Sequence, residues 1–231
     1  IRDDLVTGSS DVCSSDLVSV IADTGSILDG GDTDVDIAAD SLLLNAALDI
    51  GIFGNALDTQ VTVLTAVSGT GDISVVEVDD LVIDQVSVNV NRVGSDTGLS
   101  LVGETQSDVS TAGDGSIVIL TTNGDITIND GDGSAAPVSM RALVIRAGVG
   151  IGVSAENGNI LIQNQGEGTN LNVNADIVTG AGNVSMLSTT DIVQSSDAGI
   201  RTDSGTVDLE AAAGAIVMAD TATDRKSTRL N

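Results

Sequence analysis

Two oxygen-rich runs are the residues best suited to chemistry in this chain. Asp29–Asp34 reads Asp-Gly-Gly-Asp-Thr-Asp, and Asn129–Gly133 reads Asn-Asp-Gly-Asp-Gly. Carboxylate and amide oxygens on a backbone bent by glycine are ligands that Ca²⁺ prefers. Neither run fits an EF-hand loop or the Gly-Gly-x-Gly-x-Asp nonapeptide, and turn chemistry explains the same residues without a metal. Calcium is therefore the one candidate cofactor, with four candidate ligands: Asp32, Asp34, Asp130 and Asp132.

Residues for catalysis are harder to find. Paired carboxylates, such as Asp79 with Asp80 or the set Asp32, Asp34 and Asp36, could serve as general acid and base on a glycoside. With 34 acidic residues in 231, such clusters arise by chance and also suit solvated corners. A nucleophilic triad needs a histidine base, and the sequence has no histidine. No catalytic residue is predicted, and the enzymatic alternative is a polysaccharide lyase or hydrolase.

The charge balance limits the partners of the protein. Only 8 basic residues oppose the 34 acidic ones, which gives a formal net charge of -26. Nucleic acid is excluded as a partner because its phosphates would be repelled. No apolar run reaches the 18 residues of a membrane span, so membrane insertion is not expected. The remaining expected partners are glycans or other surface proteins.

A short unit, Gly-x-Ile/Val-x-apolar, recurs along the chain. The strands and corners that it forms must position the candidate metal-binding and catalytic carboxylates. We expect the glycine to adopt positive φ at a tight corner, and the two apolar residues to share one face of a strand. Successive copies lie 46, 44, 43, 24 and 23 residues apart, which indicates a period near 23 and about nine rungs. Full copies begin at Gly71, Gly115, Gly124, Gly158, Gly182, Gly205 and Gly214, with a partial copy at Gly25.

This period predicts an all-β fold, a right-handed parallel β-helix (β-solenoid) with about 23 residues and three short strands per rung. Phe53 is the only aromatic residue, so the core must be narrow and filled by small aliphatic side chains. Propeller blades normally carry aromatic signatures and are disfavoured. The run 38–47 could instead form one short helix. Inward-facing side chains are expected at Ile117, Ile119, Ile126, Ile128, Ile160 and Ile162.

Both ends depart from the periodic pattern. Residues 1–17 and 225–231 resemble translated sequencing adapters, so we expect them to be an artefactual leader and tail. Residues 18–224 are then one repeat domain, expected to be a fragment of a longer protein and monomeric within it. Cys13, the only cysteine, lies in the leader, so the redox compartment cannot be read from thiols.

The run Asp49–Thr59, followed by Leu64–Ala66 and Gly71–Val75, resembles the repeats of large bacterial surface proteins related to filamentous haemagglutinin. The region 182–218 is similar. The resemblance implies a right-handed parallel β-helix that is secreted, often adhesive and without catalytic residues. We therefore expect a non-catalytic extracellular or cell-surface protein, an adhesin-like or structural stalk that displays loops away from the cell.

Overall fold

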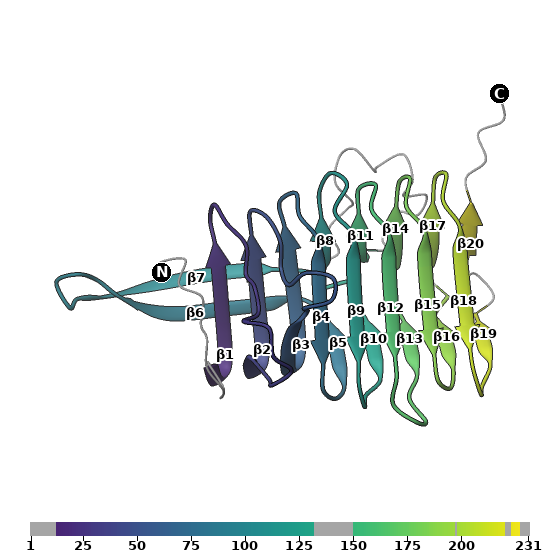
Figure 1. Ribbon diagram of the computed structural model, residues 1–231, viewed down its shortest axis with the longest axis horizontal. Coiled ribbons are helices and arrows are strands. Elements are labelled where there is room, and N and C mark those ends of the chain that lie inside the picture. The colour runs from purple at the N-terminus through teal and green to yellow at the C-terminus, as the bar shows by residue number, and fades with distance from the viewer. Residues whose placement is uncertain (1–12, 132–149, 197, 220–222, 227–231) are drawn as a thin grey trace.

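Each turn of the chain consists of three short parallel strands separated by corners (Figure 1). The computed structural model describes residues 13–131, 150–196, 198–219 and 223–226. Within these residues the secondary structure is entirely β, and no helix that could cross a membrane occurs. The prediction of an all-β parallel β-helix is confirmed.

The three strands of a turn define three sides of the solenoid. Side one consists of β4 (Ile73–Glu77), β9 (Ile117–Thr121), β12 (Ile160–Asn164), β15 (Val184–Ser188) and β18 (Val207–Ala211). Side two consists of β5 (Leu81–Ile83), β10 (Ile126–Ile128), β13 (Leu171–Val173), β16 (Ile192–Gln194) and β19 (Ile216–Met218). Side three consists of β8 (Val109–Thr111), β11 (Ile151–Ala155), β14 (Asp176–Thr179), β17 (Gly199–Thr202) and β20 (Thr223–Lys226).

At the N-terminal end, three long strands bend around more than one side. They are β1 (Cys13–Ala22), β2 (Ile37–Ala46) and β3 (Leu57–Ser68). Along its length β3 pairs in turn with β4, β5 and β8. The run that could have formed a helix lies mostly in β2, because its apolar side chains stack on equivalent residues of β1 and β3. The pairing also continues into both expected end segments, at Cys13 in β1 and at Arg225 in β20.

The core is a stack of aliphatic side chains in register. Side one contributes one interior column, in which each residue pairs with the equivalent residue of the next rung: Ile27, Ile50, Ile73, Ile117, Ile160, Val184 and Val207. All six side chains expected to face inward, from Ile117 to Ile162, are buried. Each is worth about 1.5–3 kcal/mol relative to an exposed side chain, so the column is a main source of stability.

The number of rungs is smaller than expected. Ile73 pairs directly with Ile117, and Ile117 pairs directly with Ile160. The intervals of 44 and 43 residues are therefore single rungs with insertions, whereas the interval of 46 residues spans two rungs through Ile50. The prediction of about nine rungs is too high: among the described residues the side-one column has seven members, and the side-two column that begins in β1 has eight. The predicted period is confirmed in the plain rungs, where Asn183 follows Asn159 by 24 positions and Thr206 follows Asn183 by 23.

The glycines of the repeated unit are needed for close contact between rungs. A side-chain carbon added to Gly158 would overlap the backbone carbonyl of Gly115, and one added to Gly205 would overlap that of Gly182. Positive φ occurs at other glycines, such as Gly51. The expectation of positive φ at the unit's own glycines is therefore wrong, and the reason for glycine is the missing side chain.

One insertion is an antiparallel hairpin that projects from the solenoid (Figure 1). It consists of β6 (Val86–Val93) and β7 (Leu99–Gln106), paired from end to end. Without residues 86–106, Ile117 would follow Ile73 at the same interval as in a plain rung. The hairpin is thus an addition to a normal rung.

Candidate functional site

The residue just before each member of the side-one column belongs to a hydrogen-bonded ladder. The side-chain oxygen of one rung accepts the backbone N–H of the equivalent residue in the next rung. Asp72 Oδ1 accepts from Ser116 N at 2.7 Å, and Asn159 Oδ1 accepts from Asn183 N at 2.9 Å. The whole ladder is Ser26, Asp49, Asp72, Ser116, Asn159, Asn183 and Thr206.

A second ladder occupies the corner between sides one and two. Asp80 Oδ1 accepts from Asp125 N at 2.8 Å, and Asp125 Oδ1 accepts from Asn170 N at 2.7 Å. Asp191 Oδ1 continues the series by accepting from Ala215 N at 2.7 Å. Each such bond satisfies a donor that would otherwise face the gap between rungs. Many acidic residues of the chain are therefore structural acceptors.

The carboxylate pair considered for general acid and base catalysis belongs to this framework. Asp80 is a ladder member, and Asp79 Oδ2 accepts from Gln60 Nε2 at 3.2 Å. Asp79 also lines an open acidic groove of about 420 Å³ with Asp16 and Asp40. Among the described residues, neither lysine nor arginine lines this groove, so it offers no positive group for an acidic polysaccharide.

Three other carboxylates come together near the N-terminal end. Asp29, Asp36 and Asp58 place carboxylate oxygens within 4.8 Å of one another, and Asp29 is only 7% exposed. Asp29 Oδ2 accepts from Gly31 N at 2.9 Å, and Asp36 Oδ2 accepts from Asp58 N at 3.1 Å. Such a group of oxygens can take up either a proton or a hard cation.

The electrostatics of this cluster are unfavourable at neutral pH. Burial raises the pKa of Asp58 to about 6, and the negative charges of Asp36, Asp29 and Asp32 add to the effect. The pKa of Asp36 is also raised, first by burial and then by the neighbouring carboxylates, although the N–H of Asp58 opposes the rise. A proton or a cation would therefore relieve repulsion here.

Among the described residues, none of the predicted calcium ligands belongs to this group of three carboxylates. Asp32 and Asp34 lie on the exposed surface of this loop, where Asp32 Oδ1 accepts from Asp34 N at 3.0 Å, and neither belongs to the three-carboxylate group. Asp130 Oδ2 accepts from Gly150 N at 3.0 Å and so closes a corner. Asp132 lies outside the described residues. Sequence reasoning missed Asp58, which follows Asp36 by one rung, because only the register brings the two together.

Glu77 is a carboxylate buried among uncharged hydrogen-bond donors. It is 0% exposed, and its two oxygens accept from Thr59 Oγ1 at 2.7 Å, Val61 N at 3.0 Å and Val78 N at 2.9 Å. Burial raises the pKa of Glu77 to about 7, while these hydrogen bonds oppose the rise. Glu77 therefore joins β3 to the end of β4, and its charge state depends on pH.

An ion pair lies inside the plain rungs. Arg201 Nη1 is 3.0 Å from Asp176 Oδ2, and both side chains are almost fully buried. The two residues come from adjacent rungs, on β17 and β14. Removing one partner of such a pair costs about 3–5 kcal/mol, so its role here is structural.

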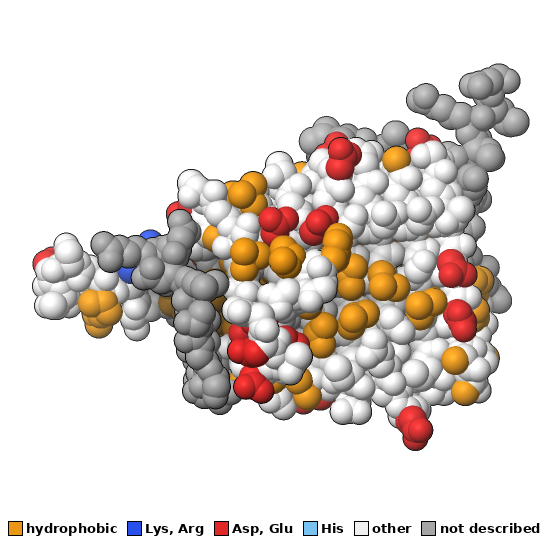
Figure 2. All heavy atoms as spheres, in the orientation of Figure 1, with side chains coloured by type: hydrophobic (Ala, Val, Ile, Leu, Met, Phe, Trp, Pro, Cys, Tyr) orange, Lys and Arg blue, Asp and Glu red, His pale blue; other side chains and the backbone are white. Residues whose placement is uncertain are grey.

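Apolar side chains also reach the outer surface. Figure 2 shows a band of them across the rungs on one face and a further group on the projecting hairpin. A groove of about 430 Å³ on side one is lined by Phe53, Val118 and Leu161 together with Asn159 and Asn183. Its lining is more apolar than that of the groove beside Asp79.

In comparisons with known proteins, no protein-family model, no curated protein and no solved structure matches the chain.

Proposed function

We propose that this chain is a non-catalytic, rod-like part of a secreted bacterial surface protein, an adhesin-like or structural stalk that displays loops away from the cell. The observation that carries the proposal is the interior column from Ile27 to Val207, which joins seven successive rungs. A stack connected in this way is stiff along its axis, because each rung is fixed by two neighbours. The resemblance to haemagglutinin-like repeats supports the same proposal from the sequence.

The use of the acidic residues supports the absence of catalysis. In the two corner ladders, the carboxylates of Asp49, Asp72, Asp125 and Asp191 accept backbone N–H bonds from the next rung. A carboxylate held in this way is a poor general base, since one of its oxygens is already engaged and its position is fixed. The formal net charge of -26 suits a soluble protein in salty or calcium-containing surroundings outside the cell.

The projecting parts are the proposed points of contact with glycans or other surface proteins. The hairpin exposes Val93, Leu99 and Leu101, and the side-one groove exposes Phe53 beside the amides of Asn159 and Asn183. Exposed apolar groups next to amides can bind either a sugar ring or a protein surface.

The proposal is tested with the whole chain against a panel of polysaccharides. Release of reducing ends and of unsaturated uronates measures turnover, and a glycan array measures binding. We expect binding without turnover, and turnover of any acidic polysaccharide would instead establish the lyase or hydrolase alternative. Two variants locate the contact: Phe53→Ser for the groove and removal of residues 86–106 for the hairpin.

A further inference from the structure

Phe53, the only aromatic residue of the chain, lies at the tip of a tight turn. Ile52 and Asn55 close this turn with two backbone hydrogen bonds, of 3.0 and 2.9 Å. Gly54 has a φ of +89°, as at the third residue of a type II turn. Asn55 Nδ2 also donates to the backbone oxygen of Asp29 at 3.2 Å. The aromatic ring is therefore held on a fixed support, yet it is 51% exposed, so core packing does not account for it.

The ring of Phe53 borders the side-one groove, which crosses three successive rungs. The other residues that line the groove lie on β9, β12 and β15 or directly before them. Its floor contains Val118 and Leu161, which pair with each other on adjacent rungs. Two rung intervals of about 4.8 Å separate β9 from β15, a span of about 10 Å. The groove is therefore elongated along the solenoid axis and has room for more than one sugar ring.

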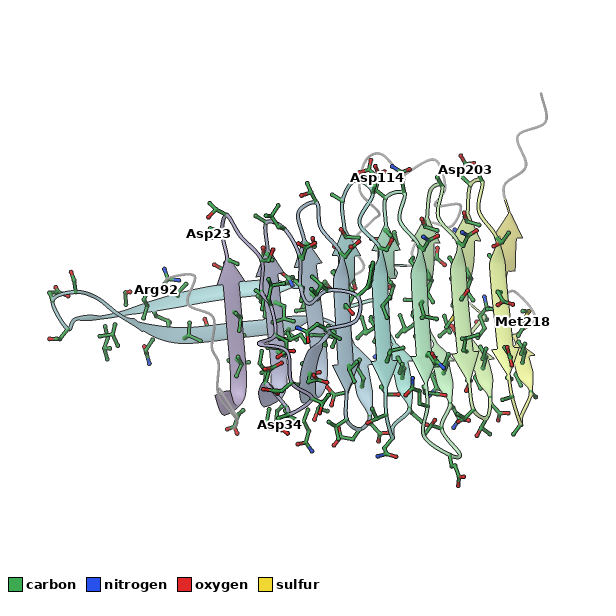
Figure 3. All side chains as sticks on the ribbon, viewed as in Figure 1. Asp23, Asp34, Arg92, Asp114, Asp203 and Met218 are labelled. Carbon is green, nitrogen blue, oxygen red and sulfur yellow. The ribbon has the colours of Figure 1, made fainter. Side chains whose placement is uncertain are left out.

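The lining of this groove carries no charge among the described residues, although the chain has 34 acidic residues. The groove beside Asp79, in contrast, also contains the carboxylates of Asp16 and Asp40. Acidic side chains at the corners before β9 and β18, Asp114 and Asp203, point outward from the rungs (Figure 3). Since binding surfaces match their ligands in charge, an uncharged groove favours an uncharged ligand.

The first corner ladder changes in chemistry where it enters the groove. Its members Asp49 and Asp72 are carboxylates, whereas the three members that line the groove are uncharged: Ser116, Asn159 and Asn183. Carboxylates would serve the ladder equally well, because Asp80 and Asp125 follow one another in the second ladder. The amides in the groove are thus not required by the ladder, and they point to a ligand with hydrogen-bonding groups.

Hydrogen-bond donors remain on this edge after the ladder has formed. Asn159 Oδ1 accepts from the backbone N–H and from Nδ2 of Asn183, at 2.9 and 3.0 Å. Asn159 Nδ2 itself donates to no acceptor among the described residues, and within them Ser116 Oγ only accepts. A groove with an apolar floor, an aromatic wall and a few polar groups at one edge is typical of a ligand site.

We propose that the side-one groove binds an uncharged polysaccharide that lies along the solenoid axis, with one sugar ring stacked on Phe53. A sugar ring presents C–H groups on its faces and hydroxyl groups at its edges. The C–H groups would pack on Phe53, Val118 and Leu161, and the hydroxyl groups would accept from Asn159 Nδ2 and Ser116 Oγ. This inference rests on the proposed function, which places glycan contacts here, and adds the charge and the direction of the glycan.

The variant Phe53→Trp gives a direct measurement, because the chain contains no other tryptophan and no tyrosine. Its fluorescence is recorded during titration with hydroxyethyl cellulose, laminarin and mannan, which are uncharged, and with carboxymethyl cellulose and alginate, which are acidic. The two cellulose ethers differ in charge on the same backbone. We expect at least one uncharged polysaccharide to shift the emission saturably to shorter wavelength, and the acidic ones to leave it unchanged.

The variant Asn159→Asp separates binding from folding. A carboxylate keeps the acceptor for the N–H of Asn183, but it removes the free donor and adds a charge, so binding should weaken about tenfold or more. Asn170→Asp is the matched control, because Asn170 Oδ1 accepts from Asp191 N at 3.2 Å in the second ladder, and it should leave binding unchanged. Phe53→Ser, on the exposed turn, should abolish binding and keep the β circular dichroism.

The possible results separate this inference from the proposed function. Lack of binding to every uncharged polysaccharide would overturn the inference, and so would equal binding of the two cellulose ethers. Binding that survives Phe53→Ser but is lost when residues 86–106 are removed would also overturn it, while the hairpin would remain a contact of the stalk. Release of reducing ends together with binding that depends on Phe53 would support the groove and overturn the non-catalytic function instead.

Discussion

The rungs between β12 and β19 and those between β3 and β10 are built on the same columns but differ in what they carry. The plain rungs are short and regular, and their polar residues include ladder members and a buried ion pair. The rungs near the N-terminal end carry the hairpin, the acidic cluster and the buried Glu77. Contacts between rungs supply stability in both regions, and the added parts supply exposed or ionisable groups.

The largest difference between the regions is expected at glycine. Gly158→Ala in a plain rung places a methyl group against the carbonyl of Gly115 and should lower the free energy of unfolding by at least about 3 kcal/mol. Gly94→Ala at the hairpin tip first meets the exposed end of Asp96, at 2.8 Å, and should cost less than about 0.5 kcal/mol. Urea unfolding measures both variants. Equal losses would show that the rungs can separate to admit a side chain.

The next effect is pH dependence, which should arise in the N-terminal rungs. The folded pKa is about 6 for Asp58 and about 7 for Glu77, against ordinary values of 3.8 and 4.5. Because both values are raised, stability is greatest below about pH 4 for these two groups and falls as the pH rises to 7. Taken in full, the two shifts amount to about 5 kcal/mol between pH 4.5 and pH 7.5. Because solvent screens the half-buried Asp58, we expect a loss of roughly 3 kcal/mol, most of it from Glu77.

Chemical unfolding at several pH values measures this loss. Asp58→Asn removes one of the two groups and should flatten the lower part of the curve, between about pH 4 and pH 6. Asp203→Asn, an exposed corner substitution in a plain rung, is the control and should leave the curve unchanged. A stability that rises between pH 4.5 and pH 7.5 in the unsubstituted chain would contradict the assignment.

A smaller effect is expected in the ladders. Asp125→Ala removes the acceptor of the Asn170 N–H at 2.7 Å and should cost about 1 kcal/mol. Asp125→Asn keeps an oxygen at that position and should recover most of the loss. Thermal unfolding of the two variants distinguishes the hydrogen bond from the charge. Equal stability of alanine and asparagine would mean that the ladder contributes nothing at this rung.

The smallest expected effect is that of calcium. Millimolar Ca²⁺ should raise the melting temperature by about 2 °C over sodium at equal ionic strength, because it relieves repulsion among Asp29, Asp36 and Asp58. Asp58→Asn should reduce the rise, while Asp130→Asn should not. Identical melting temperatures in the two salts would show that calcium does not stabilise the protein at this cluster.

Much of the solenoid follows from local sequence, and much of the candidate site does not. The inward side chains of Ile117 and Ile160 follow from spacing alone, since alternate residues of a strand share a face. The predicted number of rungs was too high because the hairpin is nearly as long as a rung. In the sequence, a rung with this insertion therefore resembles two plain rungs. Alternating Val86, Val88 and Val90, then a glycine-bounded turn and Leu99, were the available signal for a hairpin.

The acidic cluster could not be predicted for a different reason. Asp29 and Asp36 are close in sequence, but Asp58 joins them only through the pairing of successive rungs. A period that varies slightly from rung to rung does not tell which aspartates face each other. Register is set by the columns of the core, and the positions of surface oxygens follow from it.

The hairpin leaves the solenoid between β5 and β8, and the long connection from β10 to β11 begins at the corresponding corner one rung later. In the first plain rung the same corner needs only two residues, Asn174 and Ala175, between β13 and β14. One corner of the scaffold thus accepts segments of very different length while the strands on both sides stay paired, with one register shift between Ile151 and Val153 in β11. For protein engineering, this corner is an insertion site for foreign peptides, and peptides inserted in successive rungs would lie one rung apart.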